Sequence, residues 1–211
     1  MPKHGPHRDP EAQQRILDAT RELICSRGPN QVSINEIASA ANVGKQTIYR
    51  WWPSKAAVVV DALEQMVEAE NPSPTTGSAY GNIQTQMRRV ARSFASPTGA
   101  IIRELVAESQ GDPSVAEMFR AGFFAERRAR AAAVIQAGID SGELSSAIDV
   151  ETSIDILYAP MWLRLLIGHE PLTAAAADQL LDHVWPALAT PDADSSKSGK
   201  VASQRVKYHS K

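Results

Sequence analysis

The sequence predicts an all-α protein in which a small N-terminal helical domain precedes a larger C-terminal helical domain. Apolar residues recur at helical spacing along most of the 211-residue chain. No stretch alternates apolar and polar residues in the way that a β-strand does. Residue types that begin and end helices, such as Ser, Asp, Pro and Gly, stand at the ends of the apolar patterns.

The first helix is predicted between Asp9 and Gly28. Asp9 suits the N-cap, Pro10 suits the first helical position, and Gly28 suits the helix end. The predicted buried stripe is Ile16, Leu17, Thr20, Leu23 and Ile24.

Cys25, the single cysteine, is expected to be a small packing residue. One cysteine, no signal-peptide pattern and no apolar run of membrane-spanning length favour a cytoplasmic protein.

Two short helices joined by a tight turn are predicted within residues 33–55, SINEIASAANVGKQTIYRWWPSK. Ser33 and Glu36 have the spacing of a capping box, in which each side chain satisfies a backbone N–H at a helix start. Asn42 tolerates a left-handed backbone, and Gly44 follows two residues later. Together these two residues permit a sharp turn into the second helix.

The second short helix, at about residues 45–51, is predicted to have one apolar and one polar face. Ile48 and Trp52 lie four residues apart and would face inward. The residues expected on the opposite, solvent-facing side are Lys45, Gln46, Tyr49 and Arg50. A two-turn helix of this kind suits insertion into the major groove of DNA, so the pair is interpreted as a helix-turn-helix.

The span 15–60 resembles the N-terminal domain of tetracycline-repressor (TetR) family transcription regulators. The residues that carry the resemblance are Ser33, Ile37, Ala38, Thr47, Ile48, Tyr49, Trp51, Trp52 and Lys55. One departure is Trp52 followed by Pro53, where the family more often has Phe and a polar residue. The resemblance implies a three-helix helix-turn-helix DNA-binding domain and a C-terminal helical ligand-binding and dimerisation domain. It also implies a dimeric repressor that a small apolar ligand releases from a near-palindromic operator.

The same resemblance implies which residues contact DNA. The predicted DNA-binding set is Ser33, Lys45, Gln46, Thr47, Tyr49, Arg50 and Lys55. Within it, Lys45 and Gln46 are expected to reach base edges from the start of the recognition helix. Thr47, Tyr49 and Lys55 are expected to hold phosphates.

A fourth helix is predicted from Pro53 and Ser54 to Glu70, before the turn-rich segment NPSPTTGS. Five further helices are predicted at residues 80–94, 98–110, 112–141, 149–168 and 173–189. Kinks are expected near Gly122 and at Pro160. The predicted domains are therefore residues 9–70 and 71–190, with a disordered tail at 191–211.

Large apolar and aromatic side chains gather in the C-terminal domain, and some of them must be plain core. Those near the predicted kink of the 149–168 helix favour a small-molecule pocket at Phe123, Tyr158 and Trp162, for an unknown apolar or aromatic ligand. A solid core without a pocket fits the residues equally well. The family resemblance favours the pocket.

The last two helices are predicted to form a dimer interface. Their apolar residues are too broadly distributed for one narrow stripe, so each helix is expected to face both its own domain and a partner. The predicted interface residues are Leu157, Met161, Leu165, Leu181, Val184, Trp185 and Leu188. A two-fold related copy would complete a four-helix bundle. The alternative is that these helices close a monomeric core.

Charge is distributed unevenly along the chain. Residues 1–55 hold eight Lys/Arg against five Asp/Glu, whereas residues 56–190 hold nine against seventeen. A basic head on an acidic body suits a DNA reader, although ordinary scatter explains the excess equally well. Within the body, Arg127, Arg128 and Arg130 are expected to form a solvated helix face.

The sequence contains no recognisable catalytic or metal-binding set. The five histidines do not pair with Cys, Asp or Glu at zinc-ligand spacing, and the phosphate-loop and G-x-S-x-G patterns are absent. We therefore expect no enzyme activity, metal or cofactor.

The expected partners are operator DNA, a second copy and a small molecule, with no membrane. The competing interpretation is a helical binding or scaffold protein that keeps the head only as a fold; the polar face of the second helix favours the regulator.

Overall fold

The computed structural model describes residues 9–70 and 77–191, and every regular element in these ranges is a helix. One isolated bridge pairs Leu144 with Ala189. The all-α prediction is confirmed. Among the described residues, no helix is both long and apolar enough to cross a membrane. The predicted tail, apart from Pro191, and most of the predicted linker lie outside the described residues.

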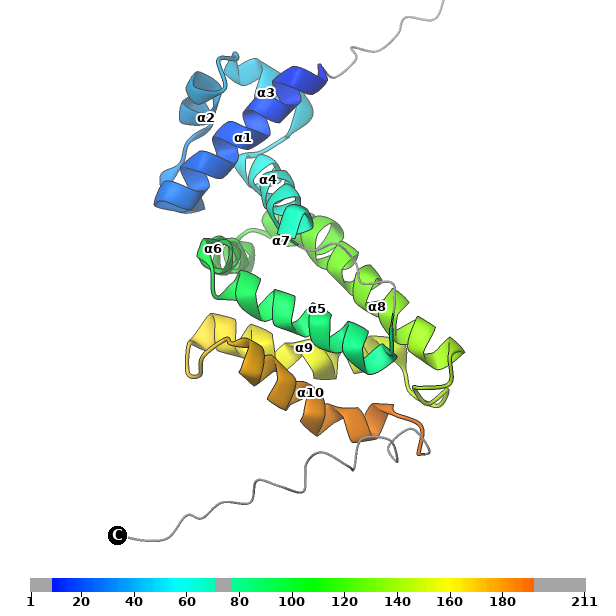
Figure 1. The fold of residues 1–211 in the computed structure, drawn as a ribbon. Coiled ribbons are helices and arrows are strands. Elements are labelled where there is room, and N and C mark those ends of the chain that lie inside the picture. The colour runs from blue at the N-terminus through cyan, green and yellow to red at the C-terminus, as the bar shows by residue number, and fades with distance from the viewer. Residues whose placement is uncertain (1–8, 71–76, 192–211) are drawn as a thin grey trace, which may run out of the picture.

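The N-terminal unit, which we call the head (residues 9–54), is built from short helices around α1 (Figure 1). Its elements are α1 (Pro10–Arg27), the 3-10 turn η1 (Pro29–Gln31), α2 (Ile34–Ala40) and α3 (Lys45–Trp51). Helix α1 begins as predicted, because a side-chain oxygen of Asp9 accepts from the N–H of Glu11 at 3.0 Å. Ile16, Ile37 and Ile48 are completely buried in the core that these helices share.

Helix α4 (Lys55–Glu70) runs from the head into the body (Figure 1). Ser54 caps it, since the Ser54 hydroxyl accepts from the N–H of Ala57 at 3.2 Å. Val58 and Val59, near its start, are buried in the shared core, and Val67, near its end, lines a cavity of the body. Because α4 belongs to both units, the predicted division at residue 70 stays a proposal.

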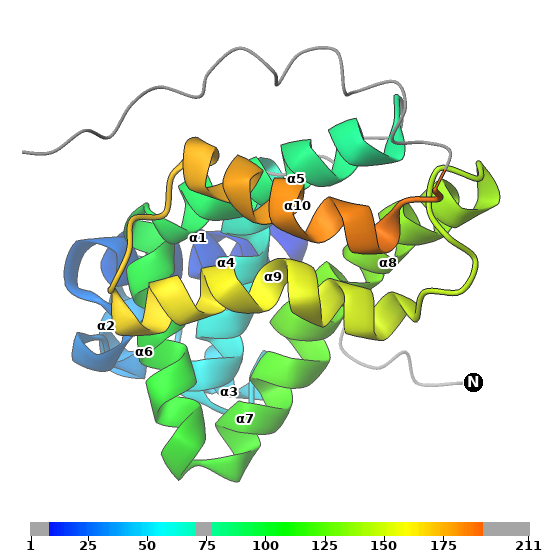
Figure 2. The ribbon, with the colours of Figure 1, turned by 90° about the horizontal axis from the view of Figure 1, so that it is seen from below.

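The remaining helices form the body. They are α5 (Ala79–Phe94), α6 (Pro97–Gly111), α7 (Pro113–Phe119), the π-helical segment η2 (Arg120–Phe124), α8 (Ala125–Asp140), α9 (Val150–Ile167) and α10 (Ala174–Leu188). Helices α9 and α10 lie side by side as an outer layer on one face (Figure 2). Helix α10 is tied to α5 by Arg88, whose Nε and Nη2 donate to the two carboxylate oxygens of Asp178 at 2.6 and 2.7 Å.

The long helix predicted at residues 112–141 is divided by the π-helical segment η2. Its irregular turn contains Gly122, where the sequence predicted a kink. A Cβ on Gly122 would lie 2.7 Å from Glu64 Oε1 and 3.4 Å from Val60 Cγ1, both on α4. Glycine therefore lets η2 approach α4 closely. Single-turn π segments inside α-helices are rare and frequently lie at functional sites.

Other local predictions had mixed outcomes. Helix α9 has the predicted ends, with Asp149 as N-cap and Gly168 in the left-handed conformation at φ 70°. It continues through Pro160 as one helix.

Cys25 is exposed, so its prediction as a packing residue is wrong. Cys25 is turned about 100° along the helix from the buried Ile24, which places it outside the apolar stripe.

The head and the body meet at η1. The N–H of Asn30 donates to Glu104 Oε2 of α6 at 3.1 Å, and Lys55 Nζ of α4 donates to the Pro29 carbonyl at 3.0 Å. Gly28, just before η1, has φ 79° and ψ 154°, a region open essentially to glycine alone. A Cβ there would also lie 2.5 Å from Glu104 Oε1. The body helix α6 therefore holds the head turn directly.

Candidate DNA interface and ligand cavity

The first helix of the predicted helix-turn-helix is fixed at its start by a complete capping box. The Ser33 hydroxyl accepts from the N–H of Glu36 at 3.3 Å, and Glu36 Oε2 accepts from the N–H of Ser33 at 2.9 Å. Arg27 Nη1 of α1 donates to Glu36 Oε1 at 2.9 Å. Hydrogen bonds from the Ser33 hydroxyl, then from the Ser33 backbone and from Arg27, lower the pKa of Glu36 to about 2. This carboxylate therefore joins the end of α1 to the start of α2.

The turn into α3 has the predicted geometry. Asn42 has a positive φ of 53°, the only such non-glycine residue in the described ranges. Ile48 and Trp52 are buried, as their spacing predicted. Trp52 Nε1 also donates to Asp61 Oδ2 of α4 at 2.6 Å. Helix α3 is therefore anchored by its apolar face to both the head core and α4.

The opposite face of α3 is presented to solvent. The exposed residues on it are Lys45, Gln46, Tyr49 and Arg50. Tyr49 leaves 51% of its surface uncovered, so its ring and hydroxyl are accessible to a partner. Thr47 is half-buried. The structure thus brings the predicted base-reading residues together on one exposed helix face.

The two predicted DNA contacts outside α3 have partners within the chain. The ammonium of Lys55 donates to Pro29, but an ammonium has three N–H donors, so a phosphate can still be bound. The Ser33 hydroxyl donates to Glu36 Oε2 at 2.8 Å and belongs to the capping box. Ser33 is therefore first of all a helix cap, although it remains exposed.

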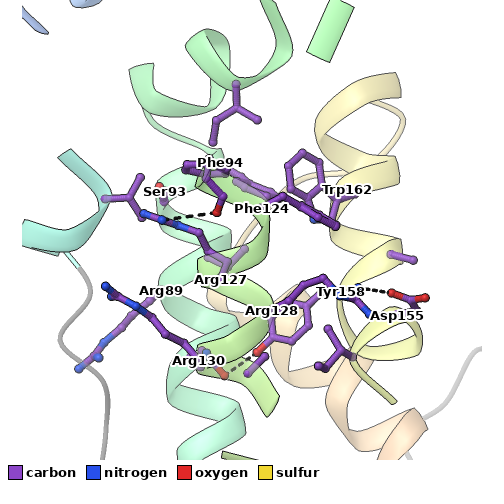
Figure 3. A pocket seen from close by; sticks show the side chains of 18 of the residues that line it. Arg89, Ser93, Phe94, Phe124, Arg127, Arg128, Arg130, Asp155, Tyr158 and Trp162 are labelled. Carbon is purple, nitrogen blue, oxygen red and sulfur yellow. Dashed lines mark hydrogen bonds and ion pairs between the residues drawn. The ribbon is translucent and has the colours of Figure 1, made fainter. Parts of the chain in front are cut away.

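The body contains a cavity of about 390 Å³. Its wall comes from α4, α5, α6, η2, α8 and α9 (Figure 3). Phe123, Tyr158 and Trp162, the three residues predicted from the sequence to bind a ligand, all line it. A cavity of this size and lining is typical of sites for small organic ligands.

Aromatic rings pack around Trp162 on one part of the wall. The ring centroid of Trp162 lies 4.9 Å from that of Phe94 and 5.9 Å from that of Phe124, both edge to face. The hydroxyl of Tyr158 donates to Gln86 Oε1 at 2.7 Å, and burial raises the pKa of Tyr158 well above its ordinary value. Tyr158 is therefore a neutral hydrogen-bond donor.

The arginines of α8 do not form the solvated face that we expected. The side chains of Arg127, Arg128 and Arg130 are only 21%, 23% and 24% exposed, and all three line the cavity. The guanidinium of Arg127 lies 4.2 Å from the ring centroid of Phe123, one helical turn earlier. The repeated Phe-to-Arg spacing of four residues, also found from Phe124 to Arg128, was the sequence signal that we missed.

Carboxylates of α8 and α9 bind these arginines. Arg128 forms ion pairs with Glu151 and Asp155, each at 2.5 Å. Glu126 is shared, since one oxygen is 2.5 Å from Arg130 and the other is 3.3 Å from Arg127. The guanidinium groups are therefore positioned by side chains of α8 and α9.

The residues predicted for the dimer interface lie mainly in the core of one chain. The buried ones are Leu157, Met161, Leu165, Leu181, Trp185 and Leu188, and only Val184 is half-buried. Buried side chains have little surface left for a partner. The large apolar residues that α9 exposes are instead Ile156, Leu163, Leu166 and Ile167. The sequence pattern located the apolar excess of α9 but could not tell the inner face of that helix from its outer face.

A capped helix, a tight turn and a second helix with an exposed polar face define a protein of the helix-turn-helix class. Two family models match the chain. The model described as "Bacterial regulatory proteins, tetR family" matches residues 16–62, and "Tetracyclin repressor-like, C-terminal domain" matches residues 73–184. The chain belongs to the TetR family of bacterial transcription regulators.

Individual relatives agree with this family. An uncharacterized HTH-type transcriptional regulator of Bacillus subtilis, YdeS, is 35% identical over 194 residues, which cover 92% of this chain and 98% of YdeS. The transcriptional repressor KstR of Rhodococcus jostii is 28% identical over 80% of this chain and 77% of its own. The crystal structure of the TetR family regulator SCO0332 superposes with a TM-score of 0.77 at 30% identity, covering 85% of this chain and all of that one.

The protein is therefore a DNA-binding transcription regulator, as the resemblance implied. Its relatives are regulators, not enzymes. The competing interpretation, a scaffold that keeps the head only as a fold, is not favoured by the exposed polar face of α3.

Proposed function

We propose that the protein is a dimeric repressor in which α3 enters the major groove of a near-palindromic operator. The observation that carries this proposal is the division of α3 into a buried anchor, Ile48, and an exposed polar face opposite it. Lys45 and Gln46 at the start of α3 contact base edges, where amide and ammonium groups distinguish adenine and guanine. Thr47, Tyr49 and Lys55 bind phosphates, and Arg50 suits either role.

Two substitutions separate base reading from phosphate binding. Gln46→Ala lowers affinity for the preferred operator by about 1–3 kcal/mol and changes which sequence is preferred. Lys55→Ala weakens binding to all sequences about equally and lowers the salt dependence. Both are measured by fluorescence anisotropy on operator and scrambled DNA at several salt concentrations. The exposed Gln136→Ala on α8 is the control. Parent-like binding by both head variants would contradict the assignment.

The dimer forms through the outer faces of α9 and α10. On α9, Ile156, Leu163 and Ile167 recur seven and four residues apart, so they make one exposed apolar stripe, and Leu166 lies beside it. Both helices form the outer layer of the body (Figure 2). Pairing with a two-fold related copy would cover this stripe and place two heads on one DNA face.

Sedimentation velocity at micromolar protein tests the interface. Leu163→Asp makes the protein monomeric and weakens operator binding, because a charge is buried at the centre of the stripe. Ala137→Asp adds the same charge to an exposed position of α8 and leaves the dimer intact. A parent that sediments as a monomer and still binds its operator tightly would overturn the dimer.

A small molecule in the cavity releases the operator. Val67 of α4 lines the cavity, and η2, which carries the lining residues Phe123 and Phe124, packs against α4 at Gly122. A ligand that fills the cavity therefore contacts the helix that carries the head. It releases DNA to the extent that it binds the DNA-free arrangement more tightly.

Filling the cavity with protein tests this step. Val90→Phe introduces a ring into the cavity wall and blocks ligand-dependent stabilisation in a thermal-shift screen. Val106→Phe, at a half-buried position of α6 that does not line the cavity, keeps the response. Hits that stabilise both variants and the parent equally would place the ligand elsewhere.

A further inference from the structure

The cavity wall offers many hydrogen-bond donors and few acceptors. Of its lining residues, four are arginines and one is a carboxylic acid. That acid, Asp155, accepts from Arg128 Nη1 at 2.5 Å. The amide oxygen of Gln86 accepts from Tyr158. Guanidinium groups have only donors, so a molecule that fills the cavity meets donors that its own acceptors can satisfy.

Ser93 adds a buried hydroxyl to the same wall. It lies on α5 and is 5% exposed, and its Oγ has no hydrogen-bond partner among the described residues. A buried polar group without a partner destabilises a fold, and such groups are often retained for a ligand. The hydroxyl rotates about its Cβ–Oγ bond, so its hydrogen can be directed towards an acceptor.

The donors and the apolar side chains occupy different parts of the cavity. Figure 3 shows Arg89, Arg127 and Arg130 on the side opposite Trp162. Trp162 packs edge to face against Phe94 and Phe124 in the aromatic part of the wall. The cavity therefore has a cationic side and an apolar side.

We propose that the ligand of this regulator is an amphipathic carboxylate whose carboxylate lies on the side of Arg127, Arg130 and Ser93, and whose apolar body packs against Trp162. This inference rests on the proposed ligand-responsive function and specifies its ligand class. A planar guanidinium matches a carboxylate with two parallel hydrogen bonds, which a neutral carbonyl compound cannot form. Arg127 and Arg130 already bind the carboxylate of Glu126, which shows that their donors can meet on one such group.

Matched acids and amides test the ligand class by calorimetry. The probes are decanoate and decanamide, and biphenyl-4-carboxylate and biphenyl-4-carboxamide. Each pair shares its apolar body and differs in charge. We expect at least one carboxylate to bind about tenfold more tightly than its amide, because charge-assisted hydrogen bonds are stronger than neutral ones.

Substitutions of the cavity arginines test whether the ligand carboxylate binds in the cavity. Arg127→Gln lowers carboxylate affinity by about tenfold and leaves amide affinity unchanged, which removes the preference. Arg120→Gln is the control, because Arg120 is 62% exposed, pairs with Glu117 and does not line the cavity. Arg130→Gln gives a second measurement of the same effect if Arg127→Gln is poorly folded.

Ser93→Ala separates binding from folding. It weakens the carboxylate several-fold, yet the melting temperature without ligand stays at or above that of the parent, since the buried hydroxyl has no partner to lose. The proposal is overturned if the amides bind as tightly as the acids, if the arginine variants keep the preference, or if no carboxylate binds at millimolar concentration. Operator release by an amide alone would overturn the carboxylate and retain the proposed function. A parent that binds no DNA would instead contradict the function.

Discussion

The head and the body use the same kind of helix but differ in how they fill the space between helices. In the head, Ile16, Ile37 and Ile48 are completely buried, and the buried hydroxyl of Thr20 donates to the Ile16 carbonyl at 2.7 Å. In the body, helices surround a cavity of about 390 Å³, and the buried hydroxyl of Ser93 has no such partner. A filled core whose buried hydroxyl is hydrogen-bonded holds α3 in one orientation. A core that contains a cavity leaves room for a ligand.

The two units are connected through α4, through η1 and where α1 packs against α6. Helix α4 contributes Val58 to the shared core and Val67 to the cavity wall. At η1, Glu104 of α6 accepts from the head. A change of packing in the body can therefore reach the head through α4 and through the contacts of α6 with η1 and α1.

Replacing one tryptophan in each unit compares the two cores directly. Trp52→Ala lowers the free energy of unfolding by about 3–5 kcal/mol and abolishes operator binding, because it empties a filled core and removes the bond to Asp61. Trp162→Ala has the smaller effect on stability, since its ring already borders the cavity, and the larger effect on ligand binding. Urea unfolding at matched protein concentration measures both, and equal losses would show that the cores are not different.

Gly28→Ala tests the junction at η1. The variant forces an alanine into a backbone region reserved for glycine and against Glu104, so stability falls by about 1–3 kcal/mol. Adding Glu104→Ala relieves the steric contact but not the backbone strain, and it also removes the hydrogen bond from Asn30, so it restores at most part of the loss. Gly111→Ala, which meets no atom within 4 Å, is the control and should be neutral or slightly stabilising.

Removing one helix cap in the head and one in the body should change stability less than the substitutions above, and the two effects can be compared directly. Ser33→Ala removes the capping box of α2 and lowers stability by about 1 kcal/mol. Thr173→Ala removes the single cap of α10, where Thr173 Oγ1 accepts from the N–H of Ala176 at 3.1 Å, and has an equal or smaller effect. Operator binding should respond only to Ser33→Ala. Reduced DNA affinity in both variants would mean that α10 also positions the heads.

The smallest expected effect is the pH dependence that Glu36 of the head contributes. The pKa of Glu36 is about 2 in the folded protein, below its ordinary value of 4.5. A carboxyl with a lowered pKa contributes stability above pH 4.5, and this contribution is lost as the pH falls towards 2. Glu36→Gln should therefore reduce the slope of the stability curve between these values, and the lowered pKa values of Asp112 and Asp149 in the body account for part of the slope that remains. An unchanged curve would indicate that the unfolded chain holds the same interaction.

Local signals in the sequence predicted the helices well, because caps and turns depend on neighbouring residues. Asp9, Ser33 and Asp149 begin helices as predicted, and Asn42 has the left-handed backbone that the turn requires. The π-helical segment was only indicated by Gly122. Its reason is the close approach of α4, which lies about 60 residues earlier in the chain and cannot be inferred from local spacing.

The sequence by itself determined the helix-turn-helix, its polar face and the all-α class, since each depends on residues within a few turns of one another. Only the tertiary structure decided which apolar and charged side chains lie inside. It turned Leu157 and Leu181 into the core, left Leu163 exposed, and brought Arg127 from an apparent surface to a cavity wall. The physical reason is that periodicity defines the faces of a helix, but burial depends on which other helices pack against each face.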